Sequence, residues 1–177
     1  MYGKYCIPLL LLGLLARTMA SKVHPIDNNT NFTVYSTTKA ALGPKPLFTQ
    51  IGNKFYFIET EVKKNWHDAY ATCRQMGAHL ISLNSADERI AVTKFLQDNK
   101  IDTFYWTSGN DLRQQGNHVW FPTTDTVDVD IWYPGEPNNV AGKEHCDIYR
   151  YDIHLGLNDL KCESQERYIC ELPKHVN

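Results

Sequence analysis

The sequence predicts an α+β fold, and three observations lead to that prediction. Two stretches with helical periodicity lie close together, between residues 65 and 96. A hairpin signal precedes them. After them the chain has short segments rich in aromatic and β-branched residues, separated by turn-rich loops. Most of the predicted strands therefore flank the two helices instead of alternating with them, which is typical of an α+β domain.

The first predicted elements are a hairpin and a helix. Gly52-Asn53 separates two β-prone runs at 48–51 and 54–59, as in a tight hairpin. Asn65 is a suitable N-cap for the helix that follows, and Gly77 is a suitable stop signal. The apolar residues of this helix recur at i, i+3, i+4 and i+7: Trp66, Ala69, Tyr70 and Cys73.

The second helix follows a short predicted strand at 79–83. Its start is marked by a capping box, Ser85-Ala86-Asp87-Glu88. Its predicted apolar positions are Ile90, Ala91, Phe95 and Leu96. The remaining strands are predicted at 103–107, 119–121, 146–151, 156–160 and 167–172.

Residues 1–20 have the features of a signal peptide. Lys4 precedes an apolar stretch that is shorter than the ~20 residues needed to span a bilayer, and small residues follow it. Residues 21–46 read as a polar leader with glycosylation sequons at Asn28 and Asn31. We therefore expect a secreted, extracellular protein with no membrane insertion, whose globular domain covers residues 47–174.

The cysteines fit this expectation. Cys6 lies in the predicted signal peptide, and four cysteines remain: Cys73, Cys146, Cys162 and Cys170. Four cysteines in a secreted domain indicate two disulfides, for which three pairings are possible, and spacing alone does not choose among them. The formal net charge is −2 and there is no basic block, so nothing favours nucleic acid as a partner.

Oxygen-bearing side chains gather in two stretches of the chain. Glu136, Asn138 and Glu144 lie in or at the end of the turn-rich segment 122–143, and Asn158 and Asp159 follow later. Carboxylates and amides without thiolates or paired histidines suit a hard cation, and the expected oxygen ligands favour Ca²⁺ over Zn²⁺. Long loops inside compact domains are often functional, which favours a calcium site here.

Several motifs occur in order at the spacings of C-type lectins: NWHDAYATC, EPN, the Glu144-His145-Cys146 step, NDLKC and the closing YICE. The chain resembles this family from about residue 46 to 173, and it looks most like secreted insect members. The resemblance implies a C-type lectin fold with two helices, antiparallel sheets and a long calcium-binding loop. It also implies disulfides Cys73–Cys170 and Cys146–Cys162 and a cis peptide bond before Pro137.

The resemblance further implies how the chain binds its ligand. Glu136, Asn138, Glu144, Asn158 and Asp159 would hold one Ca²⁺, and two sugar hydroxyls would complete its shell. The EPN order implies mannose, fucose or N-acetylglucosamine, on glycoproteins or microbial surfaces. An auxiliary calcium site is expected to be empty or weak, because only Asp111 is acidic among the four unshared matching positions: Asp111, Gln115, Asn139 and His145.

Other interpretations stay open at this point. The chain could bind galactose, or use the lectin fold for protein contacts, and it could form oligomers that strengthen weak sugar binding. An enzyme is disfavoured, since the sequence has no HExxH, GxSxG or P-loop motif, and Asp147 with Asp152 is only a hypothetical glycosidase pair. The family often has Trp where this chain has Leu157, a position expected in the core. The four tryptophans are expected to be mostly core residues.

Overall fold

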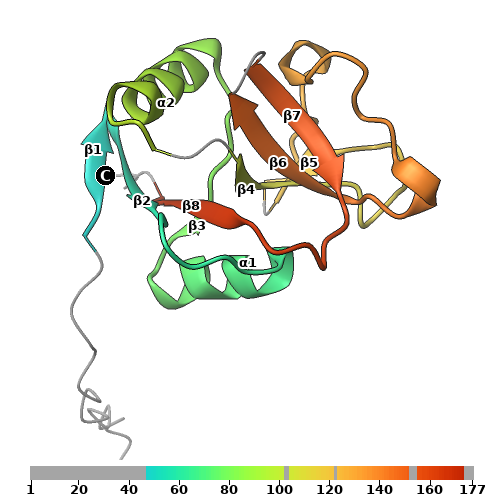
Figure 1. Ribbon diagram of the computed structural model, residues 1–177, viewed down its shortest axis with the longest axis horizontal. Coiled ribbons are helices and arrows are strands. Elements are labelled where there is room, and N and C mark those ends of the chain that lie inside the picture. The colour runs from blue at the N-terminus through green and yellow to red at the C-terminus, as the bar shows by residue number, and fades with distance from the viewer. Residues whose placement is uncertain (1–46, 102–103, 122, 152–154, 174–177) are drawn as a thin grey trace, which may run out of the picture. The chain divides into compact units, whose positions relative to one another are not determined.

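A computed structural model describes residues 47–101, 104–121, 123–151 and 155–173 (Figure 1). The predicted signal peptide, the leader with Asn28 and Asn31, and Asp152 lie outside these residues. In the part of the chain that the structure describes, no helix is both long enough and apolar enough to cross a membrane.

The domain has two α-helices and one mixed sheet. The helices are α1 (Trp66–Gln75) and α2 (Ala86–Asp98), and two 3₁₀ turns are η1 (Val129–Ile131) and η2 (Val140–Gly142). The strands are β1 (Thr49–Ile51), β2 (Lys54–Ile58), β3 (His79–Leu80), β4 (Phe104–Asn110), β5 (Val119–Trp120), β6 (Cys146–Tyr151), β7 (Leu155–Leu160) and β8 (Arg167–Glu171). The predicted α+β class is confirmed.

The strand order is β1-β2-β8-β4-β6-β7, with β3 beside β8 and β5 beside β4. The sequence predicted antiparallel sheets, but β4 and β8 run parallel, with Trp106 opposite Tyr168. This pairing joins the strands of the first hairpin to those of the second half of the chain. It makes the sheet continuous from β1 to β7.

Local capping chemistry explains why the helices begin where predicted. The Asn65 side chain accepts a hydrogen bond from Asp68 N at 2.8 Å, and Ser85 Oγ accepts one from Glu88 N at 3.2 Å. Each bond satisfies an N–H that has no partner within the helix. Gly77 has a φ of 74°, a left-handed conformation that glycine adopts at low cost after a helix.

The buried face of α2 differs from the prediction. Ile90 is 65% exposed, whereas Val92 and Leu96 are buried. Thr93 is also buried, and its hydroxyl lies 2.6 Å from the Tyr149 hydroxyl. The partner hydroxyl makes burial of the polar Thr93 acceptable, so the helix packs through a face that hydrophobicity alone did not indicate.

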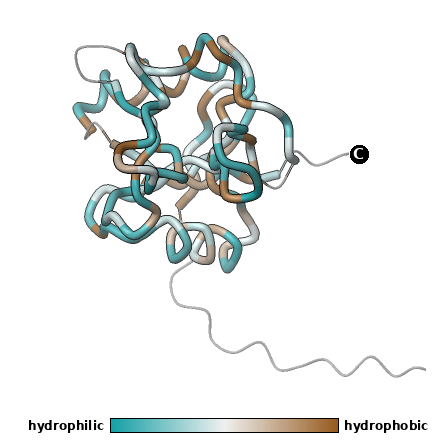
Figure 2. The backbone as a smooth tube through the Cα atoms, turned by 90° about the vertical axis from the view of Figure 1, so that its right-hand side faces the viewer, coloured by the Kyte–Doolittle hydropathy of each residue, from teal (hydrophilic) through white to brown (hydrophobic). Residues whose placement is uncertain are grey.

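Tryptophans and disulfides join the helices to the sheet. Trp66, Trp106 and Trp120 are buried, as predicted, and Trp66 Nε1 donates to Thr107 O at 2.8 Å. The disulfides are Cys73–Cys170, between α1 and β8, and Cys146–Cys162, between β6 and the residues after β7. They are the two pairs that the family resemblance implied. Figure 2 shows hydrophobic and hydrophilic residues interspersed along the tube, as expected when each element has one buried face.

Candidate functional site

The long loop before β6 is anchored to β7. Tyr133 N donates to Leu157 O at 2.8 Å, and Leu157 is fully buried, as expected for a core position. A Cβ on Gly156 would lie 2.4 Å from Tyr133 N, so only glycine permits this close approach of two backbones. The loop that begins here carries Glu136, Asn138 and Glu144 toward the end of β7.

Asp159, near the end of β7, connects the loop to the sheet. Its side chain is fully buried, and both of its carboxylate oxygens accept hydrogen bonds from loop backbone. Asn138 N donates to Oδ1 at 3.0 Å, and Asn139 N donates to Oδ2 at 2.8 Å. The two stretches of oxygen-bearing residues predicted from the sequence therefore meet at this carboxylate.

Glu144 closes the loop on itself. Its Oε2 accepts from Val140 N at 3.0 Å, and its backbone N donates to Asn139 Oδ1 at 3.0 Å. Between these contacts the chain turns through left-handed residues, with φ of 42° at Asn139 and 57° at Ala141. Glu144 is nearly buried, at 8% exposure. The same two hydrogen bonds therefore fix both the shape of the loop and the position of the Glu144 carboxylate.

Glu136 supplies the third carboxylate and is followed by a cis peptide bond to Pro137. Its Oε2 is buried and has no hydrogen-bond partner. Burial and the nearby charges of Asp159 and Glu144 raise the pKa of Glu136. A buried, unpaired carboxylate oxygen beside two further carboxylates is an arrangement that a cation would stabilise.

The donor set contains amides as well as acids. The Asn158 amide points at the Asp159 carbonyl oxygen, with Nδ2 and O 2.5 Å apart, while the Asn138 side chain is exposed. Within the described ranges, no three His, Cys, Asp or Glu side chains are arranged to hold a metal ion by themselves. A cation at this site would therefore need oxygens from the asparagines, the backbone, water or a ligand. That requirement fits Ca²⁺, which takes six to eight oxygen ligands.

A buried acid–imidazole network, which sequence reasoning missed, lies behind the site. Asp147 in β6 is opposite Asp159 in β7 and is fully buried. His118 Nδ1 lies 2.8 Å from Asp147 Oδ1, and His118 Nε2 lies 3.7 Å from Asp111 Oδ2. His145 Nδ1 lies 2.8 Å from Asp111 Oδ1. Nothing in the spacing of these residues indicates the network, because it forms between separate strands and loops.

Charges in this network influence one another. Burial would lower the pKa of His118, but its hydrogen bond to Asp147 and the charges of Asp147, Asp111 and Asp159 raise it. Burial raises the pKa of Asp147 to about 6, although His118 opposes the shift. Of the glycosidase pair considered from the sequence, Asp147 is buried and pairs with His118, and Asp152 lies outside the described residues.

The position of Asp111 bears on the predicted auxiliary calcium site. Its Oδ1 pairs with His145, and its Oδ2 accepts from Gly116 N at 2.6 Å. Both oxygens are thus engaged within the protein, and Asn139 Oδ1 is engaged by Glu144 N. That the auxiliary site is empty or weak stays a prediction.

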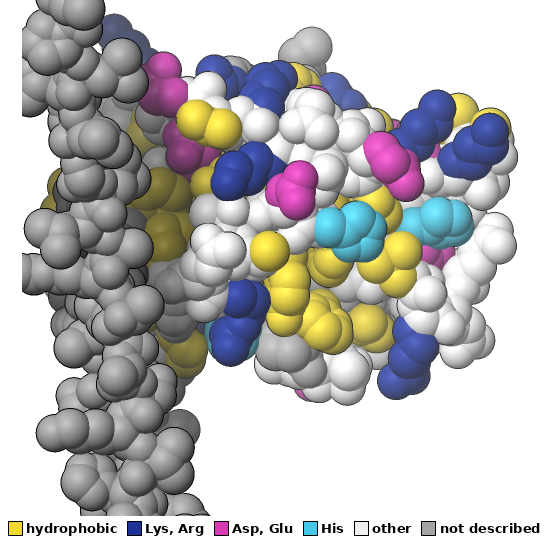
Figure 3. All heavy atoms as spheres, turned by 90° about the horizontal axis from the view of Figure 1, so that it is seen from below, with side chains coloured by type: hydrophobic (Ala, Val, Ile, Leu, Met, Phe, Trp, Pro, Cys, Tyr) yellow, Lys and Arg dark blue, Asp and Glu magenta, His cyan; other side chains and the backbone are white. Residues whose placement is uncertain are grey.

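On the face of the domain seen from below, basic and acidic side chains do not form separate patches. Figure 3 shows basic and acidic side chains interspersed there around a central group of hydrophobic side chains with histidine beside it. Figure 1 places α1 on this side of the domain.

Comparison with known proteins gives relatives of this fold. The family model described as "Lectin C-type domain" matches residues 62–172. C-type lectin 37Da of Drosophila melanogaster is 37% identical over 130 residues, which are 69% of this chain and 70% of that protein. CD209 antigen of Pongo pygmaeus is 34% identical over 118 residues, but the chain spans only 28% of that protein's length.

Solved structures agree with this result. The mouse scavenger receptor C-type lectin carbohydrate-recognition domain aligns with a TM-score of 0.63 and 25% identity, over 75% of this chain and 98% of that one. The C-type lectin domain of murine dendritic cell inhibitory receptor 2, solved in complex with N-glycan, aligns with a TM-score of 0.61 and 25% identity. That alignment covers 75% of this chain and all of the other.

Proposed function

Because this chain belongs to the C-type lectin family, we propose that it is a secreted lectin that binds glycans through one Ca²⁺. The ion would be held by three residues of the long loop and two residues of β7: Glu136, Asn138, Glu144, Asn158 and Asp159. No catalytic step is part of this proposal. The ion would supply positive charge and open coordination positions for two sugar hydroxyls.

The unpaired Glu136 Oε2 is the observation that carries the proposal. It lies near two further carboxylates, those of Asp159 and Glu144, which are held in place by backbone N–H groups. Those hydrogen bonds preorganise two acids before any ion binds, while one oxygen of the third acid, Glu136 Oε2, lacks a partner. The Asn158 amide could join the set by turning its oxygen inward, beside the Asp159 carbonyl oxygen.

The order of Glu136 and Asn138 gives the proposed specificity. A glutamate carboxylate only accepts hydrogen bonds, whereas the amide of asparagine can also donate. An acceptor followed by a donor favours the paired equatorial hydroxyls of mannose, fucose or N-acetylglucosamine, as the family resemblance implies. The relative solved with N-glycan is consistent with glycans on glycoproteins as ligands.

Retention on sugar resins tests both the ion and the specificity. We expect the purified protein to be retained on mannose or fucose resin in Ca²⁺ and released by EDTA or free sugar. EDTA-sensitive retention on galactose alone would support the calcium site but overturn the specificity. Binding that neither EDTA nor sugar releases would instead favour the alternative, a protein-interaction module.

Acid should weaken glycan binding, and Ca²⁺ should oppose that effect. The raised pKa of Glu136 means that this group takes up a proton at a higher pH than an ordinary glutamate, so metal affinity is lost as the pH falls toward that raised pKa. Protons and Ca²⁺ compete for the same oxygens. A tenfold increase in Ca²⁺ should therefore lower the midpoint of a pH titration of mannose binding, by about one pH unit if one proton competes with the ion and by less if several do. A midpoint that does not move with Ca²⁺ would contradict this competition.

A further inference from the structure

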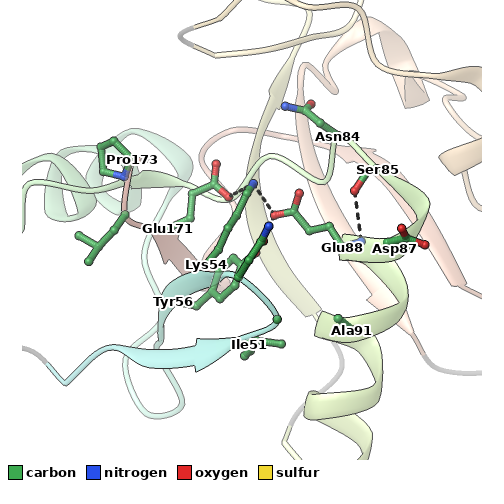
Figure 4. A pocket seen from close by; sticks show the side chains of 13 residues that line it. Ile51, Lys54, Tyr56, Asn84, Ser85, Asp87, Glu88, Ala91, Glu171 and Pro173 are labelled. Carbon is green, nitrogen blue, oxygen red and sulfur yellow. Dashed lines mark hydrogen bonds and ion pairs between the residues drawn. The ribbon is translucent and has the colours of Figure 1, made fainter. Parts of the chain in front are cut away.

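A second pocket lies away from the calcium-binding loop. The β1–β2 hairpin, the start of α2 and the end of β8 enclose a cavity of about 650 Å³ (Figure 4). Figure 1 places these elements at the left of the domain and the loop that carries η2 at the right. The volume is in the range of pockets that bind small molecules. Nothing in the proposed lectin function uses this pocket.

Two carboxylates and one ammonium meet in the pocket. Lys54 Nζ lies 2.7 Å from Glu88 Oε1 and 3.2 Å from Glu171 Oε2. The Tyr56 hydroxyl donates to Glu88 Oε1 at 2.7 Å. Figure 4 shows the two carboxylates on either side of the Lys54 ammonium. The three charged side chains are partly open to the pocket, with exposures of 14%, 9% and 13% for Lys54, Glu88 and Glu171.

Negative charge exceeds positive charge in this pocket. Lys54 is the single Lys or Arg among the described residues that line it, whereas Glu88, Glu171 and Asp87 are three acids. Lys54 therefore neutralises only part of the charge. The crowding is evident at Glu171, where burial, reinforced by the charge of Glu88, raises the pKa to about 7 although Lys54 opposes the shift. A second cation would relieve this excess.

Glu88 and Glu171 each have a second carboxylate oxygen that could accept a hydrogen bond from a ligand. Each carboxylate gives one oxygen to Lys54, and the hydrogen bonds of Lys54 and Tyr56 leave the second oxygen of each group unused. Both glutamates line the pocket, and Figure 4 shows their carboxylates beside the Lys54 ammonium. The site therefore offers two acceptors to a new donor, beside an apolar wall that suits an alkyl chain: Ile51, Ala91, Leu172 and Pro173.

We propose that this pocket binds an alkylammonium group, with the free carboxylate oxygens of Glu88 and Glu171 as its acceptors. A primary ammonium donates up to three hydrogen bonds and carries the charge that the pocket lacks. Anionic ligands are disfavoured by the excess of acids. A lysine side chain of another protein and a free polyamine share this chemistry.

An NMR titration of the full chain in EDTA tests the site apart from glycan binding. We expect cadaverine to cause saturable shifts of backbone amides around Lys54, Glu88 and Glu171, while uncharged 1,5-pentanediol causes none. A blocked lysine-containing peptide and spermidine, added separately, distinguish a protein side chain from a free polyamine as the better ligand. Shifts that do not saturate, or equal shifts with the diol, would overturn the proposal.

Matched variants locate the binding. Glu171→Gln and Glu88→Gln should each weaken cadaverine binding about tenfold or more, because each removes a charge-assisted acceptor but keeps the size of the side chain. Asp98→Asn is the control, since it removes an exposed carboxylate at the far end of α2. Equal affinity in the two pocket variants and the control would refute the site. If Glu171→Gln does not give a dispersed spectrum, Glu88→Gln decides the question.

Discussion

Replacing Asp159 with asparagine should reduce Ca²⁺-dependent glycan binding at least about a hundredfold, which corresponds to about 2.7 kcal/mol of binding free energy. The change removes the negative charge of one proposed metal ligand. It also places an amide N–H where the Asp159 carboxylate now accepts hydrogen bonds from Asn138 N and Asn139 N. The loop would then lose both its ion and one of its attachments to β7.

Isothermal titration with mannose-containing glycan, in the presence of Ca²⁺, measures this loss. Asp128→Asn is the matched control, because Asp128 is an exposed acid of the same long segment. Unchanged glycan affinity in Asp159→Asn would show that the site is wrongly assigned. If that variant is unfolded, Asn158→Ala provides the same test with a smaller disturbance, since Asn158 is only partly buried.

Most of the fold could be predicted because its signals are local. The N-caps at Asn65 and Ser85 and the turn at Gly52-Asn53 each depend on residues within one or two turns of chain. The buried face of α2 could not be predicted in the same way. Thr93 donates to Arg89 O within the helix, but it is buried against the Tyr149 hydroxyl, which is 56 residues away in the sequence. The parallel pairing of β4 with β8 likewise depends on residues that are far apart in the sequence.

The candidate site could be predicted from the sequence for a different reason. Its oxygen donors are concentrated in two stretches of the chain, and the chemistry of these donors by itself indicates a hard cation. The surrounding network could not be predicted. His118 and Asp147 are separated by 29 residues and meet only because β5 and β6 both pair with β4. Isolated histidines and aspartates carry no sign of such a contact.

The two disulfides should differ in what they support, because they lie in different places. Cys73–Cys170 joins α1 to β8 across a sequence separation of 97, and Cys146–Cys162 spans only 16 residues. In the chain-entropy model, loops of about these lengths contribute about 4.7 and about 3 kcal/mol. We expect the double variant Cys73→Ala/Cys170→Ala to lose more free energy of unfolding in urea than Cys146→Ala/Cys162→Ala.

For glycan binding, we expect removal of Cys146–Cys162 to have the larger effect. Cys146 is paired with Leu160 in the β6–β7 ladder, and Cys162 follows Asp159 by three residues, so this disulfide holds the end of β7 that carries the proposed ligands. Cys73–Cys170 joins α1 to β8, and neither element carries a proposed ligand. At a temperature where both variants are folded, removal of Cys146–Cys162 should weaken mannose affinity more than removal of Cys73–Cys170. Affinities that merely follow the folded fraction in both variants would mean that neither disulfide positions the site, and that the backbone hydrogen bonds to Asp159 and Glu144 are sufficient to do so.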